Sequence, residues 1–212
     1  GINEIADGAF VPGHKRSQIM IFEQYYLECL SHASYLIGDQ TTGRAVVVDP
    51  QRDVSAYLED ATRHGLTIEM VIETHFHADF LSGHLELAEA TGAHIVYSTV
   101  AETEFESVGM ADGERLALGE VILEFRHTPG HTPEHLSYLI TDGAFAQAPG
   151  YYLTGDFVFS GDLGRPEHLG ELAGLHGREV GIGRRGETVQ LGSGLLVGTE
   201  LRQTRIEDEG AG

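Results

Sequence analysis

Histidine and aspartate residues gather in a short segment that could bind a metal ion. The segment 73–84 reads ETHFHADFLSGH and directly follows the apolar run TIEMVI. Residues two apart on an extended backbone point to the same side, so His75 and His77 can converge on one point. Asp79 continues the same alternation. The spacing therefore predicts a group of metal-binding or proton-carrying side chains where a strand ends.

Two later segments add an imidazole and a carboxylate of the same kind. His131 lies in the sequence TPGHTP between two expected strands, and Asp156 ends the sequence LTGD. Imidazoles and a carboxylate on rigid turns at strand ends are what a divalent ion with open coordination positions requires. Each segment alone could equally hold hydrogen-bonded core histidines or a turn aspartate. The three segments together predict a metal site.

The elements that must position these residues alternate between strand and helix patterns. A turn is predicted at Thr42 and Gly43. Apolar residues at helical spacing predict a helix over 53–64, with Asp53 as N-cap and Gly65 as its stop. A second helix is expected over 82–92, and strands are expected over 18–30, 33–38, 44–50, 67–74, 94–98, 121–130, 135–140 and 151–159. This order predicts an α/β fold with helices packed outside two sheets.

The composition limits the partners and the compartment. The 212 residues include 33 acidic and 13 basic ones, which gives a formal net charge of -20 at pH 7. Such a field repels phosphate backbones and anionic bilayers, so we expect neither nucleic acid nor a membrane as partner. No apolar run is long enough to span a bilayer, and the first residues lack the pattern of a secretory signal. The single cysteine, Cys29, excludes an internal disulfide. We therefore expect a cytoplasmic protein.

The two ends of the chain differ from its middle. Residues 1–17 are polar and unpatterned, which predicts an N-terminal arm. All aromatic residues lie at or before Phe159, whereas 160–212 hold 13 of the 28 glycines. A segment without aromatic rings contributes little to a core. We therefore predict one folded domain over 18–173 and an atypical Gly-rich tail over 174–212, flexible or truncated, with little regular structure.

The three motifs together resemble those of the metallo-beta-lactamase superfamily. His-x-His-x-Asp at 75–79, the Thr-Pro-Gly-His turn at 128–131 and Thr-Gly-Asp at 154–156 occur in that family's chain order. The similarity extends from about Ile19 to Pro166. It implies a four-layer αβ/βα sandwich with the metal at the sheet edges, in agreement with the α/β pattern. The domain over 18–173 is accordingly expected to be metallo-beta-lactamase-like.

The residue after Asp79 separates branches of that superfamily. Two-metal hydrolases such as glyoxalase II have a histidine there, whereas this chain has Phe80, which cannot bind an ion. For the late histidine of those hydrolases, the downstream candidate is His176, in poor context. The segments ETHFHADFLSGH, HTPGHTPEHLSYLI and TGDFVFSGDLGRPE are instead similar to persulfide dioxygenases, in particular the bacterial type fused to rhodanese, here without the rhodanese part.

This resemblance implies a ligand set. In persulfide dioxygenases one iron is held by two histidines and one aspartate, which correspond here to His75, His131 and Asp156. Two imidazoles and one carboxylate on one face also form the ligand set of non-haem Fe(II) oxygenases. We therefore expect one Fe(II) per chain, with Zn(II) as the alternative.

The resemblance also implies a reaction and further site residues. Glutathione persulfide would be oxidised by O2 to sulfite and glutathione. His77 and Asp79 would act beside the metal ligands, orienting them or relaying protons. Arg165 and Thr132 would contact the substrate. The expected partners are a small-molecule thiol persulfide and O2, and a homodimer is compatible with the family.

Two other functions stay open at this stage. A zinc hydrolase of thioesters or lactones, of the glyoxalase II type, would use a metal-bound hydroxide and take His77 as a metal ligand. A metal-binding protein with little turnover would result if the atypical tail left the substrate groove incomplete. Oxygen uptake, thioester cleavage and metal stoichiometry distinguish the three.

Overall fold

The computed structural model describes residues 19–30, 32–144, 146–159, 162–163, 183–185, 188–190 and 196–198. The predicted arm over 1–17, Arg165 and His176 lie outside these described residues, as does most of the segment 174–212.

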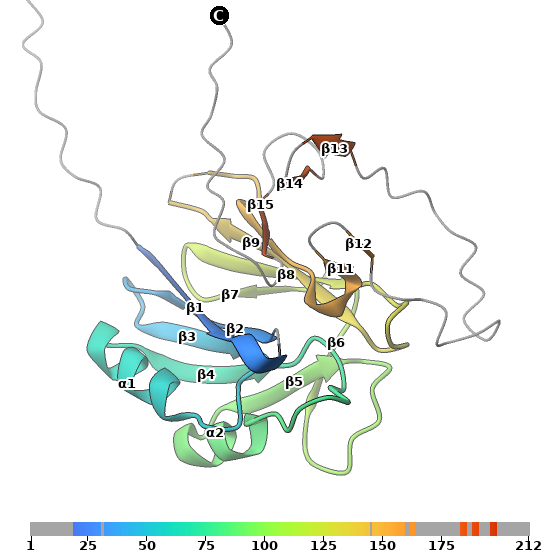
Figure 1. Ribbon diagram of the computed structural model, residues 1–212. Helices are drawn as coiled ribbons and strands as arrows, with labels where there is room; N and C mark the ends of the chain where they lie inside the picture. The colour runs from blue at the N-terminus through green and yellow to red at the C-terminus, as the bar shows by residue number, and fades with distance from the viewer. Residues whose placement is uncertain are drawn as a thin grey trace, which may run out of the picture.

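The first half of the chain forms a six-stranded sheet in the order β1-β2-β3-β4-β5-β6. Its first two pairings are antiparallel, and the pairings from β3 to β6 are parallel. The strands are β1 (Met20–Leu27), β2 (His32–Asp39), β3 (Arg44–Val48), β4 (Thr67–Ile72), β5 (His94–Ser98) and β6 (Val108–Met110). The carboxyl ends of β3 and β4 therefore meet at one edge of the sheet (Figure 1).

The second half forms a five-stranded sheet in the order β15-β10-β9-β8-β7. Its strands are β7 (Arg115–Ala117), β8 (Val121–His127), β9 (Leu136–Asp142), β10 (Tyr151–Leu153) and β15 (Leu196–Gly198). Short elements complete the described chain: the 3-10 helices η1 (Glu28–Leu30) and η2 (Gly155–Phe157), and the two-stranded pairs β11 (Val158–Phe159) with β12 (Asp162–Leu163) and β13 (Gly183–Arg185) with β14 (Thr188–Gln190).

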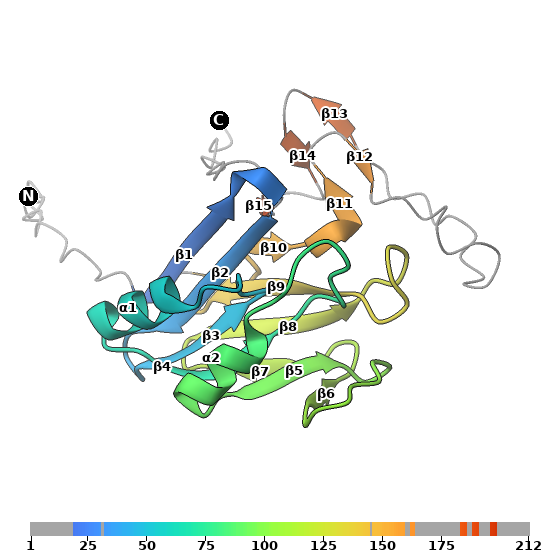
Figure 2. The same cartoon turned by 60° about the horizontal axis from the view of Figure 1, so that its bottom comes forward.

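Two α-helices cover the outer face of the first sheet (Figure 2). Helix α1 spans Ser55–His64 and helix α2 spans His84–Thr91. Helix α1 begins at Ser55, one residue later than an N-cap at Asp53 would require. The Asp53 carboxylate nevertheless accepts the Ser55 N–H at 3.0 Å and so satisfies a backbone donor of the first turn. Gly65 ends α1 with a φ of 66°, as predicted. Neither α-helix of the described residues has the length and apolarity to cross a membrane.

The hydrophobic core has two parts, one on each face of the first sheet. Between the two sheets, Val46, Val48 and Ile72 face Leu123, Phe125 and Tyr138 of the second sheet. On the other face, Val47 and Val71 pack with Tyr57 and Ala61 of α1. Burial on both faces explains the continuous apolar runs of β3 and β4. The predicted α/β class with helices outside two sheets is confirmed; in the described residues the helices cover the first sheet.

Regular structure occurs in the segment 174–212, where the sequence predicted little. Strands β13, β14 and β15 lie in it, and β15 pairs in parallel with β10, with Tyr151 opposite Leu196. The sequence reasoning did not identify these three short strands because it relied on side chains. The edge of β10 offers unpaired backbone N–H and C=O groups, which a strand without aromatic residues can satisfy.

The buried carboxylate of Asp39 connects the two halves of the fold. Its Oδ2 accepts the backbone N–H groups of Glu120 at 2.6 Å and Val121 at 3.2 Å, and its Oδ1 accepts that of Thr41 at 2.8 Å. The end of β2 is thereby joined to the start of β8.

We predict that Asp39→Ala lowers the free energy of unfolding by about 2–3 kcal/mol, because three backbone N–H groups lose a charged acceptor. Urea denaturation of the metal-free protein measures this loss. Asp53→Ala is the matched control, since its carboxylate also accepts a backbone N–H but is exposed. Equal losses in the two variants would contradict the proposed connection.

Candidate metal centre

Three predicted ligands meet where the two sheets come together. His75 follows β4, His131 lies in the turn between β8 and β9, and Asp156 lies in η2 after β10. The Oδ2 atom of Asp156 is 3.8 Å from Nε2 of His75 and 3.6 Å from Nε2 of His131. The ligating atoms of the three residues lie within 4.8 Å of one another. This separation suits side chains that share one ion, since metal–ligand distances of about 2 Å keep ligand atoms close together.

Thr74 fixes the tautomer of His75. The Thr74 hydroxyl donates to Oδ2 of Asp49 at 2.8 Å, so it accepts the Nδ1–H of His75 at 2.9 Å. The lone pair of His75 is then on Nε2, which faces Asp156. Burial lowers the pKa of His75 to about 2, and the ring is therefore neutral at physiological pH. A neutral imidazole oriented by a hydrogen bond on its other nitrogen is a prepared metal ligand.

Strand β9 and the turn before it hold the backbone around His75. The Leu136 N–H donates to the Thr74 carbonyl at 2.7 Å, and the Tyr138 hydroxyl donates to the Glu73 carbonyl at 2.7 Å. The Phe76 N–H donates to the Glu134 carboxylate at 2.9 Å. The first motif is therefore held by residues of the second sheet.

Gly155 determines where Asp156 can lie. Its φ is +50°, and a Cβ built there would lie 2.8 Å from Nε2 of His135 and 3.0 Å from the Thr74 hydroxyl oxygen. Both the backbone conformation and the available space thus require glycine. Burial raises the pKa of Asp156, with the neighbouring His131 acting in the opposite direction.

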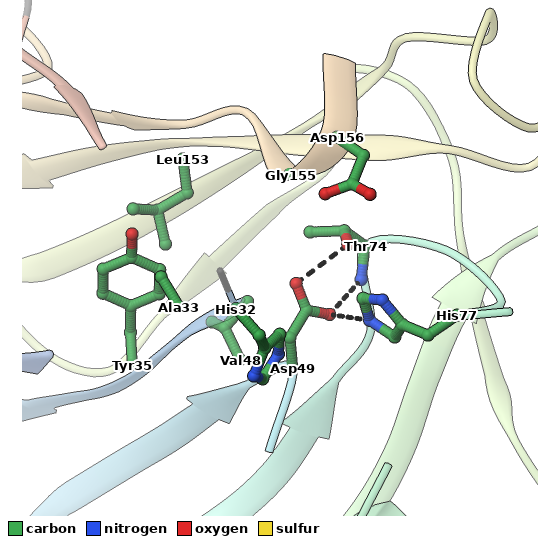
Figure 3. A pocket seen from close by; sticks show the side chains of 10 residues that line it. All are labelled: His32, Ala33, Tyr35, Val48, Asp49, Thr74, His77, Leu153, Gly155 and Asp156. Carbon is green, nitrogen blue, oxygen red and sulfur yellow. Dashed lines mark hydrogen bonds and ion pairs between the residues drawn. The ribbon is translucent and has the colours of Figure 1, made fainter. Parts of the chain in front are cut away.

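His77 forms a second group of side chains with Asp49 and Glu73. Figure 3 shows His77 next to Asp49. Its Nε2 is 3.2 Å from Oδ1 of Asp49 and 3.3 Å from Oε2 of Glu73, and all three side chains are buried. Burial would lower the pKa of His77, but the two carboxylates outweigh it and raise the pKa to about 10. Nε2 of His77 therefore faces the carboxylates of Asp49 and Glu73, whereas the Nε2 atoms of His75 and His131 face the carboxylate of Asp156.

Asp49 is a site residue that the sequence reasoning did not identify. Its carboxylate also accepts the Thr74 backbone N–H at 2.7 Å, and its φ of +48° is unusual for a residue other than glycine. Glu73, the first residue of the segment 73–84, also belongs to this group. An available signal was that Asp49 and Glu73 end two neighbouring buried strands, whose carboxyl ends share one sheet edge.

The remaining predicted site residues, Asp79, Thr132 and Arg165, are not part of either side-chain group in the described structure. Asp79 is exposed and belongs to neither group. The Thr132 hydroxyl, next to His131, is buried without a hydrogen-bond partner in the described part of the chain. Arg165 lies outside the described residues. Phe80 packs its ring against His77 at a centroid distance of 4.3 Å, which fills that side of the site with carbon.

A small cavity lies beside Asp156 (Figure 3). It offers about 30 Å³ to water-sized molecules. Its polar lining includes His32, Asp49, His77 and Asp156, and its apolar lining includes Leu153. The cavity thus reaches from the ligand group into the space between the sheets.

Known proteins resemble this chain in sequence and in fold. The family model described as metallo-beta-lactamase superfamily matches residues 27–182. The chain belongs to the metallo-beta-lactamase superfamily. Within it, a metallo-beta-lactamase from Staphylococcus aureus has 43% identity and a TM-score of 0.68, over 73% of this chain and 48% of that one. ETHE1 from Myxococcus xanthus has 29% identity and a TM-score of 0.59, over 69% of this chain and 64% of that one.

Curated members of the superfamily that match by sequence include hydrolases. The cytoplasmic hydroxyacylglutathione hydrolase of Arabidopsis thaliana is 32% identical over 144 residues, which are 66% of this chain and 55% of that protein. The hydroxyacylglutathione hydrolase of Pseudomonas paraeruginosa is 32% identical over 133 residues, 62% of this chain and 49% of that protein. The chain spans about half the length of these curated relatives.

We predict that Gly155→Ala weakens ion binding by at least about tenfold, because the added methyl group displaces Thr74 or His135 and moves Asp156. Competition with a chromophoric chelator for Zn(II) measures the affinity. Gly65→Ala is the matched control, since its φ is +66° but no atom lies within 4 Å of the added Cβ. Unchanged ion affinity in Gly155→Ala would show that Asp156 does not depend on this glycine.

His135 should make the metal-free protein less stable in acid. Burial lowers its pKa to about 3, whereas an unfolded histidine has a pKa of about 6.5. Between these values the unfolded state binds the additional proton, so the stability contributed by the neutral ring falls as the pH decreases below about 6.5.

We therefore predict that His135→Gln reduces the loss of unfolding free energy between pH 7.5 and 5.5 by about 1 kcal/mol relative to the parent protein. Urea denaturation at the two pH values measures the difference. A variant whose stability changes with pH as the parent protein's does would contradict the lowered pKa.

Proposed function

We propose that this chain is an iron-dependent persulfide dioxygenase that converts glutathione persulfide, O2 and water to glutathione and sulfite. The persulfide S–S bond breaks, and the terminal sulfur loses four electrons to dioxygen. Two oxygen atoms of the product come from O2 and the third from water, which balances the reaction. The proposal includes a cytoplasmic location, where a low-molecular-weight thiol would be the substrate.

One observation supports this proposal most directly. Two imidazoles and one carboxylate, from His75, His131 and Asp156, form a compact group with ligating atoms within 4.8 Å. That donor set on one face fits a non-haem Fe(II) with positions left for substrate and dioxygen. Phe80 stands where a two-metal hydrolase has a histidine, and its ring packs on His77. The residues present therefore fit one ion better than two.

The residues of this chain would have distinct roles around the bound ion, which supplies the redox chemistry with dioxygen. Thr74 keeps the Nε2 lone pair of His75 directed at the ion. Asp49 and Glu73 fix the Nε2 edge of His77.

Substrate contacts are a further part of the proposal. The Thr132 hydroxyl is available to bind substrate, because it is buried without a hydrogen-bond partner in the described residues. We assign the glutathione carboxylate to Arg165, since a guanidinium group binds carboxylates in a two-pronged geometry. Asp79 is exposed near the site, where it could exchange protons with solvent.

The similarity to ETHE1 supports the same branch of the superfamily. ETHE1 is a persulfide dioxygenase, and at 29% identity its likeness extends beyond fold alone.

A zinc-dependent hydrolase of glutathione thioesters is the second candidate. The observation that favours it is the identity of 32% to two hydroxyacylglutathione hydrolases. Both candidate reactions use a glutathione conjugate as substrate, so the metal and the bond cleaved distinguish them.

The deciding experiment gives Fe(II)-loaded protein freshly prepared glutathione persulfide and follows oxygen consumption together with sulfite. We expect oxygen uptake matched by sulfite formation, and a loss of at least about a thousandfold in His131→Ala, because a metal ligand is removed. Phe76→Leu is the control, since Phe76 directly follows the predicted ligand His75 but has an exposed side chain.

Other outcomes of the same experiment are equally informative. Cleavage of a hydroxyacylglutathione by Zn(II)-loaded protein, without oxygen uptake by the Fe(II) form, would establish the hydrolase. One bound ion per chain with neither activity would leave a metal-binding protein with little turnover and overturn the proposed function.

A further inference from the structure

His32 is a buried histidine that the metal-binding motifs do not include. It is the first residue of β2 and is 7% exposed. Neither ring nitrogen meets the geometry of a full hydrogen bond in the described part of the chain, although the ring makes a weak polar contact with the Asp49 backbone. Burial lowers the pKa of His32, so the ring is neutral and offers one donor and one acceptor.

Buried polar groups without partners are rare because each costs free energy that a hydrogen bond would recover. A buried imidazole with two such nitrogens therefore indicates a ligand or a water molecule that completes its hydrogen bonds. His32 lines the cavity beside Asp156, which supplies the space for one (Figure 3).

The size of the cavity limits what can bind there. Its volume of about 30 Å³ for water-sized molecules compares with roughly 10–15 Å³ needed for one water. One or two small molecules of two or three atoms fit, whereas a tripeptide does not. Asp156 is one of the three predicted ligands, so a molecule in the cavity lies next to one ligand of the ion site.

Neighbouring rings hold His32 in this position. Its ring centroid is 4.0 Å from that of Phe80 and 5.8 Å from that of His77. Phe80 thus packs against both imidazoles, and this packing opposes rotation of His32 out of the cavity.

We propose that His32 is a positioning residue that hydrogen-bonds a diatomic ligand, dioxygen in the reaction, in the cavity beside Asp156. This inference rests on the proposed function for the identity of the ligand, because dioxygen is the small co-substrate of that reaction. It assigns dioxygen to the inner side of the ion site and leaves the exposed side of His131 for the larger persulfide.

The test uses nitric oxide as the diatomic probe on the Fe(II)-loaded protein, and it requires no turnover. We expect His32→Leu to bind one iron per chain but to weaken nitric oxide binding by about tenfold, the effect of one lost hydrogen bond. The electron paramagnetic resonance signal of the iron–nitrosyl adduct should change its rhombicity. His32→Gln, which keeps a donor and an acceptor, should recover most of the affinity.

His84→Leu is the matched control. His84 is also a largely buried histidine whose two nitrogens have no hydrogen-bond partner in the described residues, but its ring packs on Phe105 and does not line the cavity. Nitric oxide affinity and signal should be unchanged in this variant.

Two results would overturn the inference. In the first, His32→Leu binds nitric oxide as the parent protein does, with the same signal. In the second, His32→Leu and His32→Gln both lose iron, which would make His32 a residue that supports the ion. Failure of the proposed dioxygenase would appear separately, as absent oxygen uptake in a parent protein that still binds nitric oxide.

Discussion

The carboxylate of Asp49 is the interaction on which the metal site depends. It accepts the backbone N–H and the hydroxyl of Thr74, and it pairs with His77. Through the Thr74 hydroxyl it also determines which nitrogen of His75 faces the ion. A single buried charge at the end of β3 thus orients two histidines of the neighbouring loop. The positive φ of Asp49 is the conformational cost of this position, and the hydrogen bonds to Thr74 offset it.

The site also depends on the packing of the two sheets. His75 comes from the first sheet, whereas His131 and Asp156 come from the second. The Tyr138 hydroxyl and the Leu136 N–H tie the backbone of residues 73 and 74 to the second sheet. An ion that binds all three ligands therefore binds the packed protein and not the unfolded chain. Folding and ion binding are coupled for this reason, and the ion should stabilise the interface between the sheets.

A few positions carry the difference between the two candidate reactions. The sequence identity of 32% to two hydroxyacylglutathione hydrolases does not by itself specify a reaction, because members of one fold family can catalyse different reactions. Phe80 is one such position, because its ring contacts the rings of both His32 and His77. The same ring borders the cavity residue His32. One aromatic side chain thus packs against two of the histidines that line the cavity.

The sequence by itself determined the local features of this protein. His75, His131 and Asp156 were predicted because each ends or follows a strand in a short recognisable motif, and the α/β order, the end of α1 at Gly65 and the turn at Gly43 follow from local spacing and glycine conformation. The tertiary structure alone decided that Asp49 and Glu73 flank His77, that His32 faces a cavity beside Asp156, and that β15 joins the second sheet. These features depend on distances between residues far apart in the chain, which local pattern does not encode. Sheet packing sets those distances.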